Sequence, residues 1–91
     1  MHQETKRAVT ARLQRIEGQV AGLSRMVAAD RYCVDVLIQI AAVRAALAKV
    51  EAQILHDHLD TCVATAFVSG DPVEQRHKVD ELVETIGRMR R

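Results

Sequence analysis

The stretch that decides the fold runs from residue 33 to residue 68 and reads CVDVLIQIAAVRAALAKVEAQILHDHLDTCVATAFV. Its main apolar residues recur at intervals of four, three, four, three and four, which is the repeat of one helix face and not the alternation of a strand. They are Val36, Ile40, Val43, Leu47, Val50 and Ile54. Because the stretch contains neither Gly nor Pro, it predicts one long, unbroken helix.

A second helix precedes the long one, and a third follows it. Residues 5–29 carry an apolar stripe with the same intervals, formed by Val9, Leu13, Ile16, Val20, Leu23 and Val27. Gly70 supplies a left-handed cap after the long helix, and Asp71 caps a third helix that has Pro72 at its first position. The apolar face of the third helix consists of Val79, Leu82, Val83, Ile86 and Met89. The sequence therefore predicts an all-α chain, with a three-helix protomer and a single domain over residues 1–91.

Composition limits the core that one chain can build. Of the 91 residues, 48% are hydrophobic but only 2% are aromatic, so aliphatic side chains must do the packing. A chain this short buries a small share of its surface, and the long helix is apolar on more sides than one neighbour can cover. Alanines cluster in its middle, where helices can approach closely. We therefore expect two long helices to pair antiparallel about an axis near Ala46 and Leu47, giving a dimer with a four-helix-bundle core.

Hydropathy and charge indicate where the protein works and what it binds. No apolar run approaches the roughly 20 residues that span a bilayer. The N-terminal residues do not resemble a signal segment, so we expect a cytoplasmic protein with no membrane partner. Net charge is +4 over residues 1–50, −6 over residues 51–84 and +3 over residues 85–91. The basic first stretch is a candidate surface for a polyanion.

The two cysteines and one histidine form a candidate metal site. Cys33 begins the long helix, and His58 and Cys62 lie near its other end, four residues apart and therefore on one face. At about 1.5 Å per residue, the helix between Cys33 and His58 measures about 37 Å, so one chain cannot join all three ligands. In an antiparallel pair, Cys33 of one chain meets His58 and Cys62 of the other. Two thiolates and one imidazole suit three-coordinate Cu(I), whereas zinc normally takes a fourth ligand.

The remaining histidines are weaker candidates. His56 lies two residues from His58 and faces away from it, and His77 has no Cys or His partner at helical spacing. His2 could add a ligand for nickel, cobalt or zinc. A nickel site therefore stays open beside the copper site.

Three segments of the chain resemble the CsoR/RcnR family of bacterial metal-sensing repressors, in its copper-sensing branch. They are DRYCVDVLIQIAAVR from Asp30, LHDHLDTC from Leu55 and RIEGQ from Arg15. In that family persulfide sensors keep both cysteines without the histidine, and formaldehyde sensors lack the last cysteine. Nickel and cobalt sensors place histidine there and recruit an N-terminal histidine. The resemblance implies that Cys33, His58 and Cys62 bind Cu(I), and that Tyr32 and Glu81 support these ligands.

The resemblance also implies how DNA is bound, since the sequence contains no helix-turn-helix or zinc finger. The resemblance implies a disc-shaped tetramer, a dimer of dimers, that binds operator DNA through basic patches on the first two helices. Arg12 and Lys49 match the family's positions. Charge and helical position add Lys6, Arg7, Arg15 and Arg44. Such contacts are made mostly to phosphates, so binding should depend strongly on salt.

Together these features predict a copper-responsive transcriptional repressor. Its apo form binds operator DNA, and Cu(I) binding at the inter-subunit site releases the DNA and derepresses copper-resistance genes. Two alternatives remain open: a nickel or persulfide sensor of the same family, and a copper-buffering protein without a DNA partner. An enzyme is not expected, because no catalytic dyad is visible and a closed three-coordinate copper leaves no position for a substrate.

Overall fold

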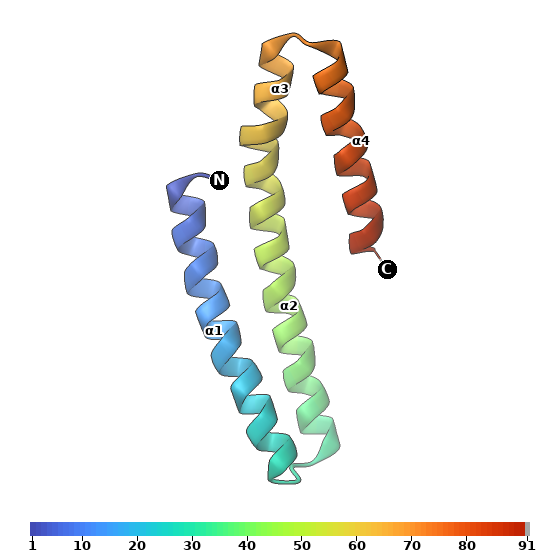
Figure 1. The fold of residues 1–91 in the computed structure, drawn as a ribbon. Coiled ribbons are helices and arrows are strands. Elements are labelled where there is room, and N and C mark those ends of the chain that lie inside the picture. Colours follow the sequence, from blue (N-terminus) through green and yellow to red (C-terminus); the bar gives the residue numbers. More distant parts are fainter. Residues whose placement is uncertain (91) are drawn as a thin grey trace. The chain divides into compact units, whose positions relative to one another are not determined.

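The computed structural model describes residues 1–90, which contain helices and no strand (Figure 1). In chain order the elements are α1 (Gln3–Ala28), α2 (Cys33–His58), a π-helix (Leu59–Val63), α3 (Ala64–Ser69) and α4 (Pro72–Met89). The predicted all-α fold is confirmed. The chain divides into two compact units, residues 1–55 and the residues from His56 onward, and each is described by itself.

The first unit is an antiparallel pair of helices, α1 and the greater part of α2 (Figure 1). Its core is a seam of four buried side chains, Val9, Ile16, Val43 and Val50, with Leu23 and Ala46 packed against it. All four valine and isoleucine positions belong to the two predicted apolar stripes. The intervals of three and four residues therefore place the contact between α1 and α2 correctly.

The connection from α1 to α2 is a tight left-handed cap. Asp30 has a φ of 53°, and its N–H bonds to the carbonyl of Val27 at 3.1 Å, while the N–H of Arg31 bonds to the carbonyl of Met26 at 3.0 Å. This is the pattern of a Schellman motif, which usually has Gly at the left-handed position. The carbonyl of Tyr32 then accepts the N–H of Val36 at 3.2 Å and begins α2. The cap thereby sets Cys33 at the start of α2.

The predicted long helix over residues 33–68 is continuous in the structure, but one segment of it is not α-helical. The chain stays helical, but Leu59–Val63 has the wider hydrogen bonding of a π-helix. There the hydroxyl of Thr61 donates to the carbonyl of Asp57 at 2.8 Å, and the hydroxyl of Thr65 donates to the carbonyl of Thr61. Such bonds compete with the backbone donors of an α-helix and distort it. Gly and Pro are therefore not the only signals of an interruption.

The second unit turns at Gly70, as predicted. Gly70 has a φ of 73°, and Asp71 caps α4 by accepting the N–H of Val73 at 3.0 Å, with Pro72 at the first helical position. The side-chain amide of Gln75 donates to the carbonyl of Phe67 at 3.4 Å and ties α4 to α3. The cap chemistry of the sequence is thus confirmed at this turn.

Much of the apolar surface stays open within one chain. In the described residues only five hydrophobic side chains are buried, and Leu37 and Ile38 of α2 are 63% and 58% exposed. On α4, Leu82 and Ile86 are half-buried, but Val83, which was predicted on the same apolar face, is 65% exposed. Across residues 1–90, no helix has the length and apolar character that a membrane crossing requires. These apolar side chains therefore stay uncovered within the described residues.

Candidate metal site and DNA-binding surface

Cys33 is a free, exposed thiol at the first residue of α2. The backbone carbonyl of the preceding residue, Tyr32, accepts a hydrogen bond in the first turn of α2. Tyr32 is 68% exposed. The ring therefore has little packing role within its own chain. A thiol and a phenol stand side by side in the sequence at the start of α2, both open to groups from outside the chain.

His58 and Cys62 lie at the junction of α2 and the π-helix. His58 is the last residue of α2 and is half-buried, whereas Cys62 is a free, exposed thiol. A π-helix joins residues five apart, so residues four and five apart are neighbours and the pair keeps a common face. The Thr61 hydroxyl also lies 3.6 Å from the sulfur of Cys62, within hydrogen-bonding distance. Sequence reasoning missed Thr61, for which adjacency to Cys62 is the only signal.

The single chain does not assemble a metal site from these residues. Among residues 1–90, no three His, Cys, Asp or Glu side chains come together in a way that could hold a metal ion. The donor types nevertheless fit a soft metal, since two free thiols and an imidazole are ligands that Cu(I) prefers. Cys33 is the first residue of α2, whereas His58 is its last residue and Cys62 lies in the π-helix that follows.

The other histidines have different surroundings. Nδ1 of His56 lies 3.3 Å from the Asp60 carboxylate, and both side chains are exposed. His77 lies on α4 beside a shallow hollow that Asp80 also lines. His2 precedes α1, and its carbonyl accepts the N–H of Lys6 at 3.0 Å. Of these three histidines, His56 on α2 pairs with a carboxylate, that of Asp60 in the π-helix.

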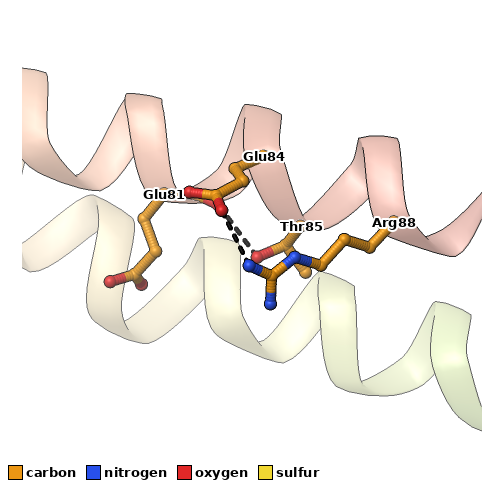
Figure 2. Close-up of polar contacts among 4 residues, drawn as sticks. All are labelled: Glu81, Glu84, Thr85 and Arg88. Atoms are coloured by element: carbon orange, nitrogen blue, oxygen red, sulfur yellow. Dashed lines mark hydrogen bonds and ion pairs between the residues drawn. The ribbon is translucent and has the colours of Figure 1, made fainter.

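Glu81 is exposed on α4, where Arg88 is already paired with Glu84. The carboxylate of Glu84 binds the guanidinium of Arg88 at 2.8 Å, and the Thr85 hydroxyl donates to the backbone carbonyl of Glu81 at 2.8 Å (Figure 2). Within residues 1–90 the Glu81 carboxylate itself has no ion-pair or hydrogen-bond partner. It is therefore available to accept a hydrogen bond from another group.

The α1–α2 pair has two flanks of different chemistry, each marked by a hollow between the helices. On the first, which we call the polar flank, the lining includes amides, a guanidinium and a glycine, namely Gln19, Gly22, Arg25 and Gln39. On the second, the apolar flank, the lining includes aliphatic side chains, namely Val20, Val27, Val36 and Ile40. The two flanks therefore fit different partners.

Three of the predicted DNA-binding residues belong to the polar flank. Arg12 and Arg15 precede Gln19 by seven and four residues, so they lie on the same side of α1. On α2, Lys49 follows Ile40 of the apolar flank by nine residues, two and a half turns, so it lies on the opposite side of the helix, the side of the polar flank. Arg12 is half-buried, and Arg15 and Lys49 are exposed. The polar flank thus gathers cations from both helices.

Two other predicted DNA-binding residues belong to the apolar flank. Lys6 precedes Leu13 by seven residues, and Leu13 precedes Val20 by the same interval. Arg44 follows Ile40 by four residues. Arg7 lies on the side of α1 that faces away from the seam, eighteen residues and five full turns before Arg25. The Arg25 side chain starts from that same side and reaches the hollow by lying back over Gly22. Within the first unit, the predicted basic set is therefore divided and does not form one patch.

The Lys and Arg side chains of α1 and α2, unlike His56, form no ion pair with an acid in residues 1–90. On α4 the opposite holds, because Arg76 pairs with Asp80 at 3.4 Å and Arg88 with Glu84 at 2.8 Å. Unpaired guanidinium groups on one flank are a suitable surface for phosphates.

Known proteins share this sequence over most of its length. The copper-sensing transcriptional repressor CsoR of Bacillus subtilis is 56% identical over 66 residues, which cover 72% of this chain and 65% of that protein. The copper-sensing transcriptional repressor RicR of Mycobacterium tuberculosis is 51% identical over 61 residues, covering 67% of this chain and 64% of that protein. The chain thus matches slightly less than two thirds of the length of these two relatives.

Solved structures share the fold. The copper-sensing repressor CsoR with Cu(I) from Geobacillus thermodenitrificans NG80-2 has a TM-score of 0.90 and 38% identity, over 100% of this chain and 92% of that one. The nickel-responsive regulator InrS has a TM-score of 0.79 and 40% identity, over 97% and 96%. The family described as metal-sensitive transcriptional repressors matches residues 5–88, and it is a family of regulators, not of enzymes. With the fold, the ligand types and this match in agreement, the chain belongs to the metal-sensitive transcriptional repressors.

Proposed function

We propose that this protein is a copper-responsive transcriptional repressor that acts in the cytoplasm. One observation carries the proposal: the free thiols of Cys33 and Cys62 and the imidazole of His58 stand at the two ends of the central helix. Their number and type suit Cu(I). The relatives named as copper-sensing repressors, and the similar structure that holds Cu(I), support copper over nickel. A single family match over residues 5–88 favours one functional domain over residues 1–91.

The metal site is formed by two protomers. α2 is a single α-helix from Cys33 to His58. With a rise of about 1.5 Å per residue, it separates these two residues by about 37 Å. Antiparallel pairing of two copies of α2 brings Cys33 of one protomer to His58 and Cys62 of the other. The exposed side chains of Leu37 and Ile38 provide apolar surface for such pairing. Two dimers then assemble into a tetramer.

The residues at this site have separate roles. Cys33, His58 and Cys62 are the ligands, and bound Cu(I) joins groups from both protomers, thereby tying the start of one α2 to the end of the other. The Glu81 carboxylate, which lacks a partner in residues 1–90, orients a ligand by accepting a hydrogen bond. The Tyr32 phenol serves the same purpose at the start of α2. Glu81 connects the site to α4, and Tyr32 connects it to the α1–α2 cap.

The polar flank binds operator DNA. Arg12, Arg15 and Lys49 contact phosphates directly, and Arg7 adds charge at the N-terminal end of α1. Lys6 and Arg44 stand on the apolar flank, so they contribute mainly through the long-range field. Copper-driven release requires that copper bind more tightly to the conformer with low DNA affinity, with a coupling free energy typically of about 1–3 kcal/mol. Release of the repressor then derepresses copper-resistance genes.

The test is an anaerobic titration of the protein–DNA complex with Cu(I), followed by the fluorescence anisotropy of labelled operator DNA. We expect anisotropy to fall to the value of free DNA at one Cu(I) per protomer. Parallel titrations with Ni(II) and with a persulfide donor should leave the complex intact. Release by Ni(II) or persulfide alone would assign the protein to that signal instead. Copper binding without any DNA binding at low salt would indicate a buffering protein.

A further inference from the structure

The hollow on the polar flank, near the C-terminal end of α1, contains basic and amide groups but no acid. It measures about 430 Å³, and its lining in the described residues includes Arg25, Arg31, Gln19 and Gln39 and no carboxylate. All four of these side chains are exposed, so they are free to approach a ligand. Neither arginine forms an ion pair within residues 1–90. Two positive charges therefore face a shared space without a counterion from the chain.

Gly22 shapes this hollow. A Cβ at Gly22 would lie 3.6 Å from a terminal guanidinium nitrogen of Arg25, so this guanidinium lies back over the glycine position on α1. The absence of a side chain there leaves the guanidinium accessible from the polar flank. Arg31 follows the left-handed cap at Asp30, which fixes its place beside the same hollow.

The donors are those that recognise phosphate. Guanidinium groups bind phosphate oxygens through two parallel N–H bonds, and glutamine amides add neutral N–H donors. A phosphodiester with its water fits the volume of the hollow. The same donors could bind the carboxylate of a small acid. Nothing else in the lining of this hollow favours a small acid over a polyanion.

Position favours DNA as the source of the phosphate. Arg12, Arg15 and Gln19 lead along one side of α1 to the hollow. Arg25 follows Arg12 by thirteen residues, about 20 Å of helix, and starts from another side of α1, so its side chain reaches back over Gly22 to the hollow. The hollow therefore extends the cationic surface of Arg12 and Arg15 toward the C-terminal end of α1.

We propose that Arg25 and Arg31, with Gln19 and Gln39, bind a backbone phosphate of the operator at the far end of the polar flank. This site is additional to the contacts of Arg12 and Lys49, and it rests on the proposed DNA-binding function. Its occupant is a DNA phosphodiester. It anchors the end of α1 that adjoins Cys33 through the Asp30 cap, so DNA contact and the metal ligand share one connection.

The experiment uses the full-length apo protein with both arginines changed, Arg25→Gln and Arg31→Gln. Operator affinity is measured by anisotropy between 50 and 200 mM salt. We expect the slope of log K against log salt to fall by about 0.9 for each protomer that engages DNA, the loss of one phosphate contact. Copper affinity and helical content should stay unchanged. Arg25→Lys with Arg31→Lys should keep most of the slope, because the charge is retained, and Arg76→Gln on α4 is the matched control.

Three results would overturn the proposal. An unchanged slope in the Arg25→Gln, Arg31→Gln protein, while Arg12→Ala lowers it, would remove the hollow from the DNA surface and leave the repressor function standing. Calorimetric binding of inorganic phosphate with an unchanged DNA slope would indicate an anion site unrelated to DNA. Failure of the unaltered protein to bind operator DNA would overturn both this site and the proposed function.

Discussion

The two units of the chain differ in net charge and in whether their cations form ion pairs. Residues 1–55 contain eight Lys or Arg and five Asp or Glu, and residues 56–91 contain five and seven. In the described residues, the cations of α1 and α2 have no acidic partner, whereas Arg76 and Arg88 on α4 each pair with a carboxylate four residues away. Exposed charges contribute little to the folding stability of a monomer, even when they are paired. The Lys and Arg side chains of the first unit therefore stay available to an external polyanion, as the proposed function requires.

The units also differ in what holds them together. The first unit has a seam of four buried aliphatic side chains, while the second unit buries only Ala66 among the hydrophobic residues described. The second unit relies more on local hydrogen bonds, such as those of Thr61 and Gln75 to backbone carbonyls. Regions with few buried apolar contacts open at low free-energy cost. The comparison therefore places the more stable part of the chain in the first unit and the more adaptable part around His58 and Cys62.

The largest effect is expected at the metal ligand of the second unit. His58→Ala removes one of three copper ligands and should weaken Cu(I) binding by about a hundredfold or more, with loss of copper-driven DNA release. Affinity is measured by anaerobic competition with a Cu(I) chelator. His56→Ala is the matched control, since His56 pairs with Asp60, and it should behave like the unaltered protein. Equal losses in both variants would mean that the imidazole of His58 has no special role.

A smaller effect is expected at the cations of the first unit. Arg12→Ala and Lys49→Ala should each weaken operator binding in both metal states and lower the salt slope by about one for each protomer engaged, because each removes a phosphate contact. The measurement is an anisotropy titration over a range of salt concentrations.

Two matched variants test whether this effect belongs to the polar flank. Arg76→Ala removes a cation that is already paired on α4, so operator affinity should not change. Arg44→Ala removes an exposed cation of the apolar flank, so its effect should be weaker than that of Arg12→Ala. If Arg76→Ala lowered operator affinity as much as Arg12→Ala, the assignment of DNA binding to the first unit would be contradicted.

The smallest effects are expected at the two left-handed caps, one in each unit. Gly70→Ala places a Cβ at a φ of 73° and should lower the free energy of unfolding by about 1–2 kcal/mol. Asp30→Gly removes a side chain from a φ of 53° and should raise it by up to about 1 kcal/mol. Chemical denaturation monitored by circular dichroism measures both. A gain in stability with Gly70→Ala would contradict the cap assignment.

Local patterns predicted most of the fold. The two valine and isoleucine stripes located the seam between α1 and α2, and Gly70, Asp71 and Pro72 located the turn. The π-helix was missed because it has no periodic signal in the sequence. Threonine hydroxyls bond to backbone carbonyls in and next to it, and such bonds compete with the α-helical pattern. Val83 was placed on a buried face because it is apolar, although the side of α4 that packs depends on where α3 lies.

The sequence predicted less of the candidate site than of the fold. Residue type and spacing predicted Cys33, His58 and Cys62, yet their assembly depends on a second chain and stays a prediction. The division of the cations between two flanks depends on the pairing of α1 with α2. The sequence therefore placed Arg44, added from charge and helical position, in one basic set with Arg12, which matches the family's position. The hollow with Arg25 and Arg31 was missed for the same reason, because its lining comes from both helices and their connection.

The sharing of the metal site between two chains can be tested by mixing two variants. Neither Cys33→Ala nor His58→Ala homodimers should hold a complete set of ligands, because about 37 Å of helix separates Cys33 from His58. In a mixed dimer, one site combines Cys33 of the His58→Ala chain with His58 and Cys62 of the other chain. Subunits exchanged by mild unfolding and refolding should therefore regain tight Cu(I) binding at half the normal capacity per mixed dimer. If heterodimers form and no tight binding returns, the ligands do not come from two antiparallel chains.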